Sequence, residues 1–104
     1  MTATALKVGS ELTPVVTQPI SRYTLAMFAG GSGDHNPMHI DTDFAHSFGM
    51  PDVFAHGMLS MAYLAQVLTR SFDQRAIRSY GVRFVSITPV KAIVTCTGKV
   101  TEIF

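Results

Sequence analysis

Hydrophobic and polar residues change their spacing along the chain, and each change marks an expected element. Residues 57–70 read GMLSMAYLAQVLTR, so apolar side chains would lie nearly all round a helix. A helix of this kind is typical of a protein interior, where other elements cover most of its sides. The pattern predicts a buried central helix, which is too short to cross a bilayer.

Alternating apolar and polar residues predict strands on both sides of this helix. Residues 6–20 are rich in Val and Thr and contain two prolines, so we expect one or two short edge strands there. Residues 78–88 and 93–104 alternate more clearly. The expected faces are Tyr80, Val82 and Phe84 against Arg83, Val85 and Ile87, and Val94, Cys96, Val100 and Phe104 against Thr95, Thr97, Lys99 and Thr101. Strands around a buried helix predict an α+β fold.

Two shorter helices are expected between the first strands and the central helix. Ser21 is a suitable N-cap for a helix over residues 22–29, which Gly30-Gly31 would end. Asp41 could cap a second helix over residues 42–48, with Gly49 and Pro51 after it. Residues 30–41 lie between them and predict a loop, because Pro37 interrupts any helix there.

Composition narrows the class of protein. The chain has 104 residues, which predicts a single domain over 1–104, and only 14% of the residues are charged. Disorder and a coiled coil are excluded, and so few charges suggest that a partner chain covers part of the surface. The net charge is +1 without a basic run, so neither nucleic acid nor an anionic membrane is an expected partner.

The cysteine count and the first residues bear on the compartment. The single cysteine, Cys96, excludes an intrachain disulfide and fits a reducing compartment, where we expect it to be a small core residue. The N-terminal segment lacks the basic and apolar regions of a signal peptide. The expected location is therefore the cytoplasm.

Candidate chemistry concentrates in the loop Gly33-Asp34-His35-Asn36-Pro37-Met38-His39. Asp34 and His39 are five positions apart in a non-helical segment, so a carboxylate and an imidazole could converge on one water molecule. Asn36 could orient either group by hydrogen bonds. The alternative is a plain loop, with Asp34 in an Asx turn and His39 bonded to the backbone.

Other residues carry weaker signals. His35 and His39 have a metal-ligand spacing, but Pro37 removes the helical face that a metal site needs, so no metal or cofactor is expected. Ser60 lacks a nucleophile elbow and is expected to bond the preceding turn. We expect His46 to be a surface or interface residue and His56 to bond backbone or shape an entrance. Arg83 would face solvent or meet a phosphate group of a ligand.

The loop motif resembles the signature of the MaoC-like or (R)-specific enoyl-CoA hydratases (hydratase 2), and Ala55-His56-Gly57-Met58-Leu59 matches a second element of that family. The resemblance extends from about residue 6 to residue 104. It implies a hot-dog fold, an antiparallel sheet wrapped around a long central helix, and usually a dimer. It also implies roles for single residues: Asp34 and His39 would hold the catalytic water, and Asn36 would orient the pair. The backbone N–H of Gly57 would face the thioester carbonyl.

The implied activity is hydration of trans-2-enoyl thioesters, or dehydration of (3R)-3-hydroxyacyl thioesters, on coenzyme A or acyl carrier protein in fatty-acid metabolism. Met50, Met58 and Met61 could line an acyl tunnel, since thioether side chains adapt to varied ligands. The alternatives are a non-catalytic hot-dog subunit of a heterodimer and a hot-dog thioesterase.

Family members usually continue with more strands, whereas this sequence ends at Phe104. The turn near Lys91 also lacks the expected Gly, Asn or Asp. We therefore expect missing residues near Lys91 and after Phe104, or a shortened form of the domain.

Overall fold

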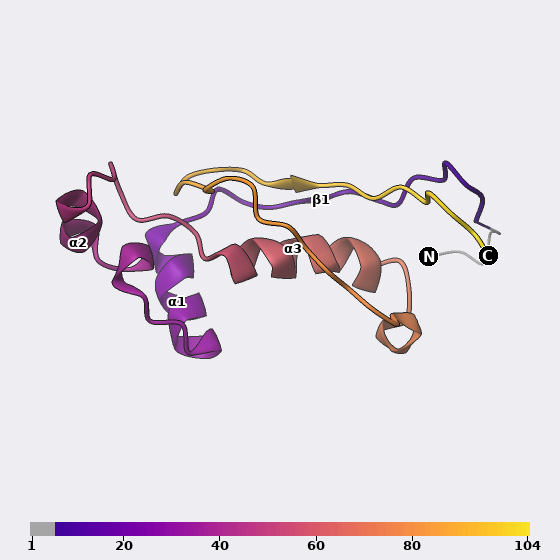
Figure 1. The fold of residues 1–104 in the computed structure, drawn as a ribbon, viewed down its shortest axis with the longest axis horizontal. Coiled ribbons are helices and arrows are strands. Elements are labelled where there is room, and N and C mark those ends of the chain that lie inside the picture. Colours follow the sequence, from indigo (N-terminus) through magenta and orange to yellow (C-terminus); the bar gives the residue numbers. More distant parts are fainter. Residues whose placement is uncertain (1–5) are drawn as a thin grey trace.

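The longest element is helix α3 (Gly57–Thr69), which lies along the middle of an elongated molecule of 51 × 22 × 22 Å (Figure 1). The computed structural model describes residues 6–104. Helix-forming residues without glycine or proline fill α3 after Gly57. Leu59 and Val67 are buried, but Met58 is 55% exposed. The helix was predicted to be buried on nearly all sides, and this is wrong for the side that carries Met58. The paired extended segments lie along one side of α3 (Figure 1).

Two extended segments pair antiparallel along this helix. Their regular parts are short: β1 is Val15–Val16 and β2 is Thr95–Cys96, with Val15 opposite Cys96. Backbone hydrogen bonds extend the pairing on both sides, from Gly9 N to Val100 O (2.7 Å) at one end and from Ile20 N to Ala92 O (2.9 Å) at the other. The expected edge strand within residues 6–20 and a strand within 93–104 are thereby confirmed, although both are interrupted.

The predicted alternation of residues 93–104 is confirmed only in part. Cys96 is buried and its neighbours Thr95 and Thr97 are exposed, as expected for a sheet with one covered face. Phe104 was expected on the same face as Cys96 but is fully exposed, because the pairing reaches only Val100. Burial raises the pKa of the Cys96 thiol, which fits its predicted place in the core.

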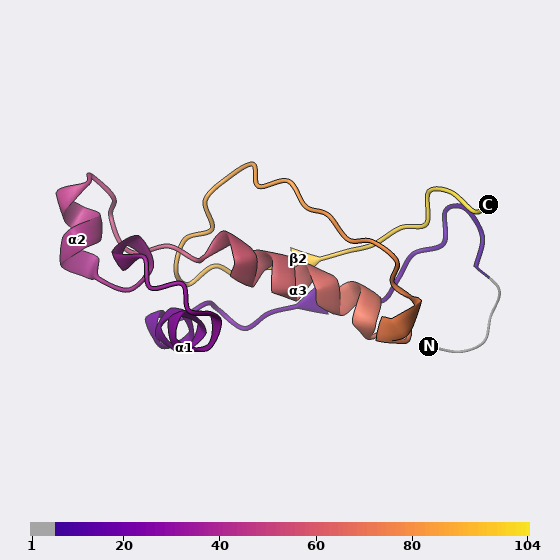
Figure 2. The ribbon, with the colours of Figure 1, turned by 60° about the horizontal axis from the view of Figure 1, so that its bottom comes forward.

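The regular strand predicted over residues 78–88 is wrong for the described chain. This segment arches away from α3 between its two ends (Figure 2) and holds no strand. The segment pairs with another part of the backbone at its C-terminal end, where Ala55 N donates to Thr88 O (2.9 Å) beside a Phe54–Pro89 bridge. The Tyr80 hydroxyl donates to Met61 O (2.8 Å) and anchors the segment to α3. A strand needs a ladder partner, and alternation alone supplies none.

Helix α1 (Arg22–Ser32) begins as predicted and ends later. The Ser21 side chain accepts a hydrogen bond from Thr24 N and caps the helix. Gly30-Gly31 was predicted to end the helix but lies inside it. The helix ends instead at Gly33, whose φ of 80° is the left-handed conformation that glycine adopts freely.

Helix α2 (Thr42–Ser47) starts after Asp41, whose side chain accepts from Phe44 N as predicted. Between α1 and α2, the single turn η1 (Pro37–His39) interrupts the expected loop. A second short turn, η2 (Gln74–Ala76), follows α3. Within residues 6–104, none of these helices has both the length and the apolar character needed to cross a membrane.

Two buried clusters hold the elements together. The first joins α1, α2 and the start of α3, and consists of Ile20, Leu25, Ala45, Val53, Ala55 and Leu59. The second joins the paired segments to the other half of α3, and consists of Leu12, Val15, Val67 and Cys96. The loop over residues 34–41 follows α1 and contacts the residues just before α3, where His39 bonds Phe54 and His56 bonds Asp34.

Candidate functional site

The loop after α1 is shaped by its own side chains. The left-handed Gly33 turns the chain out of the helix, and Asp34 Oδ1 then accepts a hydrogen bond from Asn36 N (3.3 Å). Asn36 Oδ1 in turn accepts from Met38 N (3.0 Å) and caps the short turn that ends at His39. Proline is favoured at the first position of such a turn, where its missing N–H is not needed. The loop is therefore an Asx turn, and it also fixes the direction of His39.

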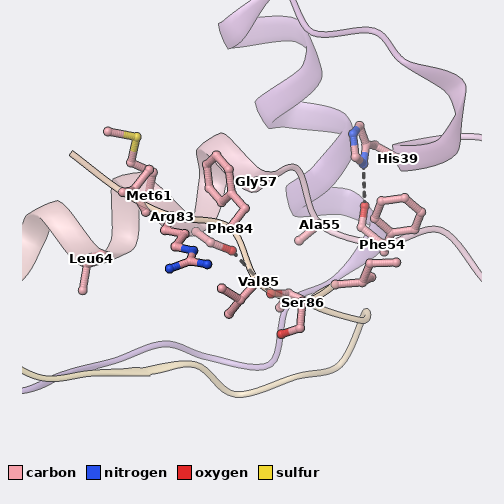
Figure 3. A pocket seen from close by; sticks show the side chains of 14 residues that line it. His39, Phe54, Ala55, Gly57, Met61, Leu64, Arg83, Phe84, Val85 and Ser86 are labelled. Carbon is pink, nitrogen blue, oxygen red and sulfur yellow. Dashed lines mark hydrogen bonds between the residues drawn. The ribbon is translucent and has the colours of Figure 1, made fainter.

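His39 is held by a backbone carbonyl. Its Nδ1 lies 2.8 Å from Phe54 O (Figure 3). A carbonyl oxygen can only accept, so Nδ1 donates and carries the proton. In the neutral ring the lone pair then belongs to Nε2. The ring also packs edge-on against Phe54, with centroids 5.1 Å apart. His39 is thus fixed in one tautomer, with Nε2 available as a hydrogen-bond acceptor.

His56 contacts both members of the predicted pair. Its side chain is fully buried, and its ring stacks on His39 with centroids 4.0 Å apart and an interplanar angle of 26°. Its Nε2 lies 3.1 Å from Asp34 O. Burial lowers the pKa of His56, so the neutral form is favoured.

The predicted catalytic residues come together. One ligand-type atom from each of Asp34, His39 and His56 lies within 4.8 Å of the others, with Asp34 at the surface and His56 in the interior. One nitrogen of each ring is already engaged by a backbone carbonyl, His39 Nδ1 by Phe54 O and His56 Nε2 by Asp34 O. The cluster is better suited to hold a polar molecule between Asp34 and His39 than to bind an ion.

A groove of about 420 Å³ begins at His39 and follows α3. One wall is the face of α3 and the other is the segment 82–88 (Figure 3). The lining is mostly apolar: His39, Phe54, Ala55, Gly57, Ser60, Met61, Leu64, Val82, Arg83, Phe84, Val85, Ser86, Ile87 and Thr88. A polar end and an apolar floor suit a ligand with one reactive group and an aliphatic chain.

Gly57 stands at the polar end of this groove, as the first residue of α3. The first N–H groups of a helix have no acceptor within the helix, and the aligned peptide dipoles favour negative charge there. A Cβ at Gly57 would lie 3.2–3.3 Å from the ring of Phe84, which covers this position. Glycine therefore allows both the helix start and the groove wall to approach closely.

The structure separates the three methionines that the sequence suggested for a tunnel. Met61 lines the groove, Met50 packs against the first core cluster, and Met58 is exposed outside the groove. Ser60 was expected to bond the preceding turn. Its Oγ instead lies 3.5 Å from Thr88 Oγ1 across the groove. Arg83 lines the groove with an exposed side chain.

The remaining histidines lie outside the cluster. His46 is exposed, as expected, and its Nε2 lies 2.9 Å from Pro51 O. His35 is also exposed and is not part of the three-residue cluster. His56 was expected to bond backbone or to shape an entrance; it bonds the Asp34 carbonyl, and its contact with His39 was not predicted. The available signal was its position directly before the start of a helix, which holds a side chain close to the helix entrance.

A family model described as "MaoC like domain" matches residues 3–103 of the chain. The chain belongs to the MaoC-like domain family. This MaoC-like chain is 36% identical over 93 residues to an (R)-specific enoyl-CoA hydratase of Rhodospirillum rubrum, a match that covers 84% of the chain and 65% of the relative. It is 40% identical over 72 residues to 3-hydroxyacyl-thioester dehydratase X of Mycobacterium tuberculosis, covering 68% of the chain and 25% of the relative.

A solved structure of a MaoC-like dehydratase superposes on this MaoC-like chain with a TM-score of 0.86 at 36% identity, covering 95% of the chain and 32% of that structure. The chain thus has the α+β hot-dog fold of these proteins, and the predicted fold class is confirmed. It spans less than two thirds of the length of the curated relatives described above.

Proposed function

We propose that the chain hydrates trans-2-enoyl thioesters to (3R)-3-hydroxyacyl thioesters and catalyses the reverse dehydration. The observation that carries this proposal is the pairing of Asp34 with a His39 whose Nε2 is left unprotonated by the Phe54 carbonyl. Two such groups can share one water molecule and divide acid and base roles between them. The names of the relatives, an enoyl-CoA hydratase and a hydroxyacyl-thioester dehydratase, support the same chemistry.

In the hydration direction the water oxygen bonds to C3 while Asp34 takes one of its protons. His39 accepts a hydrogen bond from the same water through Nε2 and keeps it in place. The C2–C3 double-bond electrons move toward the thioester carbonyl, and the resulting enolate regains a proton at C2 from the Asp34–His39 pair. The elements of water are added and the pair ends in its starting protonation state. Dehydration follows the same steps in reverse.

The enolate places negative charge on the carbonyl oxygen, and we assign its stabilisation to the N–H of Gly57. This donor lies at the N-terminus of α3, where the helix dipole favours such a charge. Removing one donor of this kind typically lowers kcat by a factor of about 100–1,000. Asn36 supports the pair through the backbone of the turn that carries His39.

The substrate class follows from the shape of the groove. Its floor is built from apolar side chains of α3, of which Met61 and Leu64 lie farthest along from Gly57, so an acyl chain would follow the helix. Met61 is the tunnel residue we retain, because its flexible side chain adapts to different chain lengths. The carrier beyond the thioester would be coenzyme A or acyl carrier protein.

We also infer a second hot-dog chain as partner, and a cytoplasmic location. The outer wall of the groove exposes Phe84 (55%), Val85 (80%) and Ile87 (56%), an apolar surface that a partner chain would cover. The buried, unpaired Cys96 fits a reducing compartment. The mass of the assembly in solution distinguishes a homodimer from a chain that needs a different partner.

The direct test is an assay of 2-enoyl-CoA esters of increasing chain length, following both loss of the conjugated double bond and release of free thiol. We expect hydration to a (3R) product without thiol release. Thiol release without hydration would identify a thioesterase instead. No turnover of any ester, also in the presence of acyl carrier protein thioesters, would indicate the non-catalytic subunit.

A further inference from the structure

His56 is a fully buried titratable residue for which the proposed reaction has no use. It is fully buried, stands directly before α3, and makes no capping hydrogen bond to that helix. The edge of Phe28 packs against its ring, with centroids 4.9 Å apart. The His56 ring also contacts the candidate active site, where it stacks on His39.

His56 connects the two residues of the Asp34–His39 pair. The Asp34 carbonyl only accepts, so His56 Nε2 donates to it over 3.1 Å and holds the backbone of the carboxylate residue. The same ring stacks under the imidazole of His39 at 4.0 Å. The side chain of His56 therefore fixes both the backbone position of Asp34 and the orientation of the His39 ring.

The second nitrogen of His56 explains why this residue holds the pair rather than transferring protons. Nδ1 is buried and has no hydrogen-bond partner. Protonating it would place an N–H without an acceptor in the interior, together with a positive charge, and both are unfavourable. A neutral His56 also leaves the stacked His39 free to gain a proton without facing a second cation.

We propose that His56 is a positioning residue for the hydratase reaction, which acts by fixing Asp34 and His39 relative to each other while remaining neutral itself. This rests on the function proposed above. Displacing reacting groups by a fraction of an ångström to about 1 Å can lower kcat by up to about a hundredfold, so a positioning residue is visible in kcat.

Glutamine and asparagine provide a matched pair of substitutions. In His56→Gln the side-chain amide can reach the place of Nε2 and donate to the Asp34 carbonyl, whereas in His56→Asn it reaches only the place of Nδ1. We expect kcat to fall by about tenfold or more in His56→Asn and by less than about threefold in His56→Gln, with KM changed by less than about twofold. The pH profile of kcat should keep its shape, since the titrating groups are unchanged.

His46→Asn is the control, because His46 also bonds a backbone carbonyl through Nε2 but lies at the surface outside the site. Circular dichroism and the melting temperature identify a variant that has lost its fold. If His56→Asn does not fold, the kcat of His56→Gln and the histidine ¹⁵N spectra of the wild type test the positioning role instead. Equal kcat in wild type and His56→Asn, with an inactive Asp34→Asn, would overturn the positioning role and leave the proposed function standing.

Histidine ¹⁵N spectra test the proposal independently of activity, also if the wild type hydrates nothing. We expect His56 in the Nε2–H tautomer at neutral pH, and the His39 signals should move in His56→Asn but not in His46→Asn. A protonated Nδ1 on His56, or His39 signals at the same positions in wild type and His56→Asn, would overturn the proposal.

Discussion

One backbone carbonyl decides which nitrogen of His39 carries the proton in the neutral ring. Nδ1 donates a hydrogen bond to Phe54 O, so Nε2 of the neutral ring is left as the acceptor. His56 repeats the device in the opposite sense, with Nε2 donating to Asp34 O. The two stacked imidazoles are therefore different tautomers, and we propose different tasks for them: His39 takes part in proton transfer and His56 positions the pair.

The lowered pKa of His56 predicts how stability depends on pH. Unfolded His56 binds a proton near its ordinary pKa of about 6.5, whereas burial opposes protonation in the fold. His39 and Asp34 are the titratable groups that face it. Protons therefore favour the unfolded state, so this contribution to stability is complete above the ordinary pKa and is lost as the pH falls below it.

Urea unfolding at pH 7.5 and pH 5.5 measures this effect. We expect the free energy of unfolding of the wild type to decrease between these values, and the decrease to be smaller in His56→Gln, which cannot be protonated. His46→Gln serves as the matched control, because His46 is exposed. Identical pH dependence in wild type and His56→Gln would show that burial does not perturb His56.

At the scale of elements, the turn before the last paired segment carries conformational strain. Lys91 has a φ of 70°, the left-handed region that favours glycine, and Ala92 N closes the turn onto Pro89 O (3.4 Å). The sequence marked this turn as unusual, because tight hairpin turns favour Gly, Asn or Asp and none of these residues stands there. The chain makes the turn regardless, with a lysine in the strained position.

Lys91→Gly is expected to stabilise the fold. Relieving a left-handed residue is worth about 1–2 kcal/mol, and the extra flexibility of glycine in the unfolded chain removes part of that gain. The free energy of unfolding should rise by about 0.5–1 kcal/mol in urea titrations. Lys91→Ala removes the charge and keeps the strain, so an equal gain in that variant would assign the effect to charge instead.

At the scale of the whole molecule, the sequence predicted the elements whose causes are local. The caps at Ser21 and Asp41, the central helix and the buried Cys96 all follow from nearby residues, and the structure contains each of them. The predicted strand over residues 78–88 and the predicted burial of the helix on nearly all sides were wrong. Both depend on neighbours from other segments, which alternation and composition do not specify.

The same distinction applies to the candidate site. Asp34, Asn36 and His39 belong to one short loop, so their closeness could be predicted from turn-forming residues and one proline. His56 is 22 positions from Asp34 and meets it only after α1 and α3 have packed together. Its place between Phe28 and His39 could therefore be seen only in the fold.

The central claim is that Asp34 and His39 activate water for addition to an enoyl thioester, and Asp34→Asn tests it most directly. Asparagine keeps the size of the side chain and its hydrogen bond to Asn36 N but cannot act as a base. Asp43→Asn is the control, since Asp43 is an exposed carboxylate on α2. We expect hydration of a short 2-enoyl-CoA ester by Asp34→Asn to slow by about 100–10,000-fold at an unchanged melting temperature, with Asp43→Asn close to wild type. Wild-type rates in Asp34→Asn would contradict the account.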